Sequence, residues 1–175
     1  MKNPIIMHIN FCEVGFASFG KTVDDVCRKA SEWGYDGIEF RSKVPNDLTL
    51  SVEEYLDEIA AGKKKYGIKE IMFGVGVTGV ANPDAAVRAK AVEDAIAFFK
   101  MANAKCGTKY CNTFADHTAS KDGRAPVANY NYHGSAVATQ EQWDWTVEGF
   151  KKIGAELEKL GMKAGFETHM NYIHG

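Results

Sequence analysis

Apolar and polar positions follow two different periods along this chain. Short runs rich in β-branched and aromatic residues predict five strands, and longer stretches that are apolar at three- and four-residue steps predict four amphipathic helices. The predicted strands cover Ile5–Cys12, Gly37–Arg41, Glu70–Val77, Lys109–Ala115 and Lys163–His169. The predicted helices cover Val23–Trp33, Val52–Tyr66, Pro83–Lys105 and Gln140–Leu160.

The ends of these helices carry local signals. Thr22, Ser51 and Thr139 each stand three residues before an acidic or amide side chain, which is the spacing of a capping box. Asn82 before Pro83 predicts a cap followed by a proline at the first helical position. Each helix should end at a glycine in the left-handed conformation, namely Gly34, Gly67, Gly107 and Gly161.

Strict alternation of strand and helix predicts a single α/β domain over residues 1–175 with a parallel sheet. Either a doubly wound sheet or a (β/α) barrel satisfies this pattern. A dinucleotide-binding sheet would carry GxGxxG after its first strand, but Asn10–Gly15 lacks it, and no GxxxxGK[ST] is present.

Net charge and composition limit the kinds of binding partner that we expect. A net charge of −2 provides no basic field for nucleic acid, and no apolar stretch approaches the roughly 20 residues that span a bilayer. We therefore expect no nucleic-acid or membrane partner and a cytoplasmic location. Four cysteines without a CxxC pair are expected to be free thiols, namely Cys12, Cys27, Cys106 and Cys111.

The strongest candidate for chemistry is the end of the fifth predicted strand. Glu167 and His169 are two residues apart, so on a strand both side chains point to one face. A carboxylate and an imidazole there can bind a divalent ion or transfer a proton. The alternative is an interior ion pair or hydrogen bond without a catalytic task.

Polar side chains also mark the ends of the other strands. Glu39 can orient a substrate hydroxyl and Arg41 can hold a phosphate or carboxylate, although the two can equally form a structural polar layer. Further candidates for substrate binding are His8, Asn112 and His117. Asn10 shares a strand face with His8. The long connection Asp116–Ala138 follows the fourth strand, where barrel enzymes build their active sites, and is a candidate substrate lid.

Two segments resemble a known family. Gly34-Tyr35-Asp36-Gly37-Ile38-Glu39 resembles the second-strand signature of the xylose isomerase-like family, and Phe166-Glu167-Thr168-His169 is similar to its fifth strand. The resemblance implies a TIM barrel that binds a small sugar or sugar phosphate and one divalent ion (Mn, Mg, Co or Zn). It implies an isomerase or epimerase in which Glu167 is both a metal ligand and the proton-transferring group. His169 would lie either beside the substrate or behind the residues that bind the metal.

The chain is shorter than a complete barrel of about 250 residues and eight strands. We therefore expect an incomplete barrel of about five strands and four helices, truncated after the fifth strand, with an incomplete active site in the isolated chain. Exposed strand edges in such a sheet favour self-association. The alternatives are a polyol or keto-acid dehydratase of the same barrel family, a metal-dependent nuclease similar to AP endonucleases, and a non-catalytic binding domain.

Overall fold

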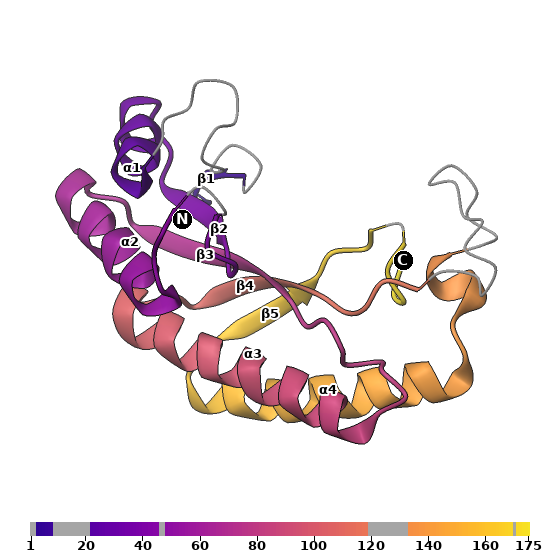
Figure 1. Cartoon of the computed structure of the whole chain (residues 1–175). Helices are drawn as coiled ribbons and strands as arrows, with labels where there is room; N and C mark the ends of the chain where they lie inside the picture. The colour runs from indigo at the N-terminus through magenta and orange to yellow at the C-terminus, as the bar shows by residue number, and fades with distance from the viewer. Residues whose placement is uncertain (1–2, 9–21, 46–47, 119–132, 170) are drawn as a thin grey trace.

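The computed structural model describes residues 3–8, 22–45, 48–118, 133–169 and 171–175, and its elements alternate as expected (Figure 1). The strands are β1 (Ile6–Met7), β2 (Gly37–Arg41), β3 (Glu70–Gly76), β4 (Tyr110–Phe114) and β5 (Lys163–Phe166). The helices are α1 (Val23–Glu32), α2 (Val52–Tyr66), α3 (Ala85–Cys106) and α4 (Gln140–Lys159), with a short 3-10 helix η3 at Gly134–Val137.

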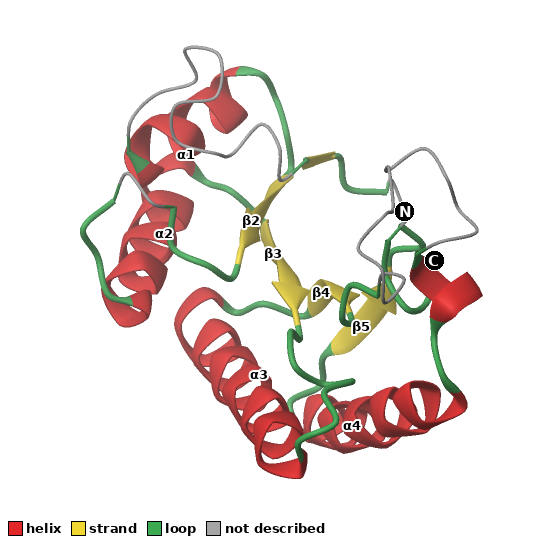
Figure 2. Cartoon of the chain, turned by 45° about the vertical axis from the view of Figure 1, so that its right-hand side comes forward, coloured by secondary structure: helices red, strands yellow, loops and turns green. Residues whose placement is uncertain are grey.

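The five strands form one parallel sheet in the order β1-β2-β3-β4-β5. A doubly wound sheet would reverse its strand order at a switch point, whereas a barrel keeps the strands in chain order. Figure 2 shows the strands along an arc with all four helices on its outer side. The predicted barrel-type sheet of five strands and four helices is therefore confirmed.

One face of the sheet packs against the helices. Ile38, Phe40 and Phe73 lie on this face and are at most 1% exposed. Aromatic rings from the helices complete the layer: Tyr55 of α2 lies edge-on to Phe40 with ring centroids 6.2 Å apart, and Phe98 of α3 lies edge-on to Phe73 at 5.1 Å. Burial of these large side chains is the main stabilising term that holds the sheet and helices together.

The opposite, inner face carries the polar candidates because of the strand register. Glu39 pairs with Met72 and Arg41 with Gly74, while Asn112 pairs with Gly74 on one side and Gly165 on the other. Paired residues in neighbouring strands share a face, so these side chains point away from the helices.

The helix ends follow the predicted signals with one exception. Ser51 and Thr139 form complete capping boxes, and the Thr22 hydroxyl accepts the Asp25 N–H at 3.1 Å. All four predicted glycines have positive φ, between 65° and 75°. The predicted cap at Asn82 is wrong: Asp84 is the N-cap of α3, because the Asn82 side chain accepts the Asp84 N–H at 2.9 Å and forms a turn before the helix.

The fifth strand ends earlier than predicted, at Phe166 instead of His169. Among the described strands, β5 pairs with β4, which ends at Phe114. After β5 the chain turns, so that the Ile173 N–H donates to Asp116 O at 3.0 Å. Of the predicted first strand, Ile5–Cys12, the structure describes the first part and pairs Ile6 and Met7 with β2.

None of the described helices combines the length and apolarity needed to cross a membrane. Cys27, Cys106 and Cys111 are buried free thiols, whereas Cys12 lies outside the described residues. Burial raises the pKa of Cys27 and Cys111 to about 12 and that of Cys106 to about 11. These three thiols are therefore core side chains and not nucleophiles.

Candidate active site

A cleft of about 290 Å³ opens at the C-terminal ends of strands β2 to β5. Barrel enzymes place their chemistry at this end of the strands. Four of the predicted site residues line the cleft: His8, Arg41, Glu167 and His169. The other lining residues are Ser42, Lys43, Gly74, Gly76, Phe114 and Tyr172.

Two glycines of β3, Gly74 and Gly76, form part of the cleft lining over the middle strand of the sheet. A Cβ added at Gly76 would meet only the Thr78 hydroxyl, at 3.9 Å, so packing against protein does not require a glycine there. The missing side chain provides room for a ligand instead.

Glu167 is the carboxylate of this cleft. It follows β5 directly, is partly buried, and its backbone N–H donates to Thr113 O at 3.4 Å, which continues the strand pairing by one step. Asn112 of β4 donates from Nδ2 to Glu167 Oε2 at 2.6 Å. This bond holds the carboxylate in one direction beside the cleft, as a general base requires. Asn112 thus orients Glu167 through a hydrogen bond but does not itself line the cleft.

Tyr172 lies on the same side of the cleft and was not predicted from the sequence. Its ring centroid lies 4.0 Å from His117, 5.2 Å from Phe114 and 5.6 Å from His169. An aromatic ring in such a cleft offers an apolar surface to a ligand.

The backbone around Tyr172 is well fixed. Thr118 N–H donates to Asn171 O at 2.9 Å, Tyr172 forms an antiparallel bridge with His117, and Ile173 is fully buried. Asn171 adopts a φ of 75°, a left-handed conformation that asparagine tolerates better than most residues. In the sequence, an asparagine before a tyrosine is a weak signal for a binding residue. Tyr172 is assigned to the cleft because of its contacts with the residues that follow β4.

Two other predicted residues do not line the cleft. His117 is exposed and packs its ring on Tyr172, so it supports a cleft residue. Glu39 lies one inward-facing position below Arg41, is 7% exposed, and its Oε1 has no hydrogen-bond partner among the described residues. Asn10 lies outside the described part of the chain, as does most of the candidate lid.

Asp116 has a structural task that spacing alone did not reveal. Its two carboxylate oxygens accept the backbone N–H groups of Gly79 and Ala81, both at 2.6 Å. Asp116 therefore fixes the connection between β3 and α3 next to the cleft.

The described residues fit a divalent ion only in part. Glu167 offers one carboxylate to the cleft, which suits a divalent cation. However, no group of three or more His, Cys, Asp or Glu side chains in the described ranges is arranged to hold a metal. A single carboxylate does not make a metal site, so no chemical step is derived from an ion here.

Comparison with known proteins agrees with this architecture. Residues 27–175 match the family described as xylose isomerase-like TIM barrel, and the chain belongs to this family. No curated protein matches the chain by sequence.

Several solved structures share the fold at low sequence identity. D-allulose 3-epimerase from Methylomonas sp., in complex with D-allulose, is 16% identical with a TM-score of 0.70, over 97% of this chain and 52% of that protein. D-psicose 3-epimerase in the presence of D-fructose is 19% identical with a TM-score of 0.63, over 93% and 51%. The IolI protein with a bound zinc atom is 14% identical with a TM-score of 0.58, over 94% and 52%. The chain thus spans about half the length of the structures that it matches.

Proposed function

We propose that the intact protein is an isomerase or epimerase of a small sugar, in which Glu167 moves a proton at the carbon next to the carbonyl group. The observation that carries this proposal is the Glu167 carboxylate, held by Asn112 at 2.6 Å beside a cleft at the C-terminal ends of the strands. The family and its structural neighbours, two of which are named as epimerases of sugars, support the choice of substrate.

Each cleft residue has a task in this reaction. Glu167 takes the proton from carbon and can return it to the neighbouring carbon on the same face, which gives isomerisation. Epimerisation would require a second acid that donates a proton to the opposite face. Tyr172 and Phe114 present apolar surface to the sugar, while His8 and His169 offer ring nitrogens to its hydroxyls. The glycines of β3 let the substrate approach the sheet closely enough to reach the carboxylate.

A divalent ion belongs to this proposal as a partner of Glu167. Such an ion, if bound, would supply Lewis-acid chemistry next to a carbonyl group. Glu167 would contribute one ligand, and the other ligands are not found among the described residues. The zinc atom bound by the structurally similar IolI protein supports the proposal.

Exchange of carbon-bound hydrogen with solvent tests the role of Glu167. We expect the intact protein to introduce deuterium from heavy water next to the carbonyl group of a ketose substrate. Glu167→Gln keeps the hydrogen-bonding shape but removes the base, and should lower the exchange rate by roughly 10²–10⁴-fold. Glu158→Gln, on the exposed side of α4, removes the same charge away from the cleft and serves as the control. Equal exchange in Glu167→Gln and the control would contradict the proposal.

A further inference from the structure

We propose that His174 is a positioning residue for Glu167. Its ring Nε2–H donates to the carbonyl oxygen of Glu167 at 2.9 Å and so fixes the main chain from which the carboxylate extends. The inference rests on the proposed function and adds a residue to it. Asn112 fixes the side chain of Glu167, whereas His174 fixes its backbone.

The carbonyl group of Glu167 lies just beyond the regular pairing of β4 and β5. This pairing ends at Thr113 and Phe166, and the Glu167 N–H continues it by one bond to Thr113 O, at 3.4 Å. No backbone N–H of the described residues donates to Glu167 O. A partly buried carbonyl group needs a donor, and the His174 ring supplies the one that the end of β4 does not.

This hydrogen bond also defines the tautomer of His174. A carbonyl oxygen can only accept, so the bond to Glu167 requires the ring proton on Nε2. The other ring nitrogen, Nδ1, is buried and has no hydrogen-bond partner in the described part of the chain. His174 is not among the residues that line the cleft. It therefore acts on the reaction through the main chain of Glu167 and not through contact with the substrate.

Aromatic contacts hold the imidazole ring of His174 in place. Its centroid lies 5.2 Å from that of Phe166 and 5.6 Å from that of Tyr172. Phe166 in turn packs on Phe150 of α4, with ring centroids 4.5 Å apart. The donor to Glu167 is thus supported by the helix layer, and such support keeps a reactive group in one geometry.

The segment around His174 is attached to two neighbouring segments. Ile173 is fully buried, and its N–H donates to Asp116 O at 3.0 Å. On the other side of His174, Gly175 O accepts a hydrogen bond from the Ser135 hydroxyl. Because both flanking residues are held, the imidazole is in position before a substrate binds, and little conformational freedom is lost during the reaction.

Two substitutions at the same position separate the hydrogen bond from ring packing. His174→Phe keeps an aromatic ring but removes the donor, whereas His174→Gln removes the ring but keeps an amide N–H at a similar reach. We expect kcat of the intact protein to fall by about tenfold in His174→Phe, with little change in KM, and by less than about threefold in His174→Gln. The substrate is the ketose from a panel of ketopentoses and ketohexoses that exchanges deuterium fastest.

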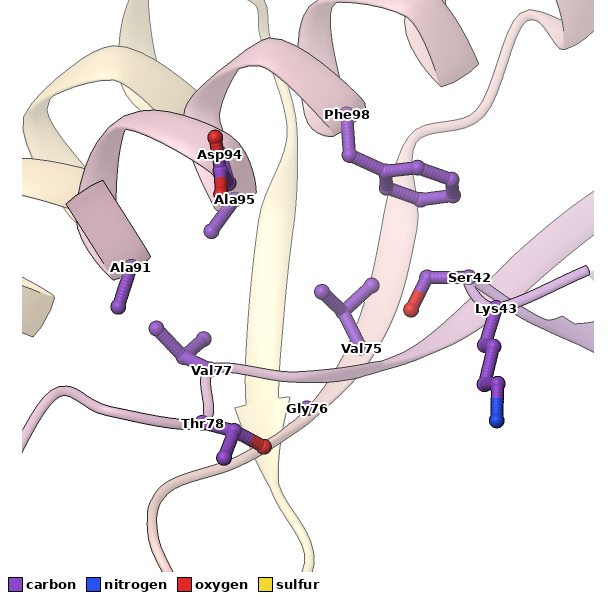
Figure 3. Close-up of a pocket in the computed structure, with 10 residues that line it drawn as sticks. All are labelled: Ser42, Lys43, Val75, Gly76, Val77, Thr78, Ala91, Asp94, Ala95 and Phe98. Carbon is purple, nitrogen blue, oxygen red and sulfur yellow. The ribbon is translucent and has the colours of Figure 1, made fainter. Parts of the chain in front are cut away.

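Two control variants report on stability and on attachment of the segment. Phe98 packs edge-on against Phe73 on the outer side of the sheet and lines a cavity of about 280 Å³ between β3 and α3 (Figure 3). Phe98→Leu should lower the free energy of unfolding but leave kcat of the folded protein unchanged. Ser135→Ala removes the hydrogen bond to Gly175 without touching Glu167, and should also leave kcat unchanged.

The tautomer of His174 gives a readout that does not depend on activity. Long-range ¹H–¹⁵N spectra of the histidine rings, with the His174 signals assigned by their loss in His174→Gln, should show the proton on Nε2. A proton on Nδ1 would overturn the inference.

The kinetic outcomes separate the inference from the proposed function. Equal kcat in His174→Phe and the wild type, or equal losses in His174→Phe and His174→Gln, overturns the inference. Deuterium exchange that still depends on Glu167 then leaves the proposed function intact. Absence of exchange in the wild type with every ketose of the panel overturns the proposed function, and the inference with it.

Discussion

At the scale of single residues, the hydrogen bond from Asn112 to Glu167 sets the direction of the carboxylate in the cleft. Asn112→Ala removes this bond and leaves Glu167 free to rotate. We expect kcat of the intact protein to fall by roughly tenfold with little change in KM, because the misplaced base affects the chemical step more than substrate binding. Steady-state kinetics of Asn112→Ala and of the wild type with a ketose substrate measure the changes in kcat and KM.

Asn103→Ala is the matched control for that prediction. Asn103 donates from Nδ2 to Thr108 O at 2.9 Å, within the connection between α3 and β4, and does not line the cleft. Its loss should lower the free energy of unfolding but leave kcat of the folded protein unchanged. An unchanged kcat in Asn112→Ala would show that Glu167 is positioned by other contacts.

The sequence predicted those cleft-lining positions that follow from strand alternation. Arg41 and Glu167 are examples, because each stands at the exit of a strand and faces inward. The position of Tyr172 in the cleft and the hydrogen bonds of Asp116 to the β3–α3 connection could not be predicted from the sequence. Both depend on chain segments that meet only after folding. His117 was expected to bind substrate, and its contact with Tyr172 is a tertiary feature of the same kind.

At the scale of elements, two helical glycines have opposite surroundings. A Cβ at Gly62 of α2 would lie 2.6 Å from Cys27 Sγ of α1, whereas a Cβ at Gly154 of α4 would meet nothing within 4 Å. Gly62→Ala should therefore lower the free energy of unfolding by about 1–3 kcal/mol through overpacking. Gly154→Ala should raise it by about 1 kcal/mol through helix propensity.

Urea unfolding of these two glycine variants beside the wild type measures both changes. A stabilising effect of Gly62→Ala would mean that α1 and α2 do not approach each other as closely as described.

Element boundaries were predictable where a local signal operates. The predicted range of α2 is exact, because the Ser51–Glu54 capping box and the left-handed Gly67 act within a few residues of each end. The end of β5 was not predictable, because a strand continues only as far as its neighbour offers hydrogen bonds. The α3 start moved from Pro83 to Ala85 since Asn82 uses its side chain for a turn.

At the scale of the whole molecule, the described sheet has β1 and β5 at its edges. Apolar side chains next to these edges are exposed: Ile5 is 52% and Phe166 50% accessible. Self-association through the strand edges therefore stays a prediction of this architecture. A monomer that persists at high concentration in light scattering would count against it.

The central claim is that a sugar binds over the glycines of β3, and nuclear magnetic resonance of the backbone amides tests it most directly. Titration with a ketose phosphate should shift the amide signals of Gly74 and Gly76 in a saturable manner, because both line the cleft. The amide signals of Gly154, within α4, and of Gly161, just after α4, should not shift. Saturable shifts centred on α4, or no saturable shift at Gly74 and Gly76, would contradict the account.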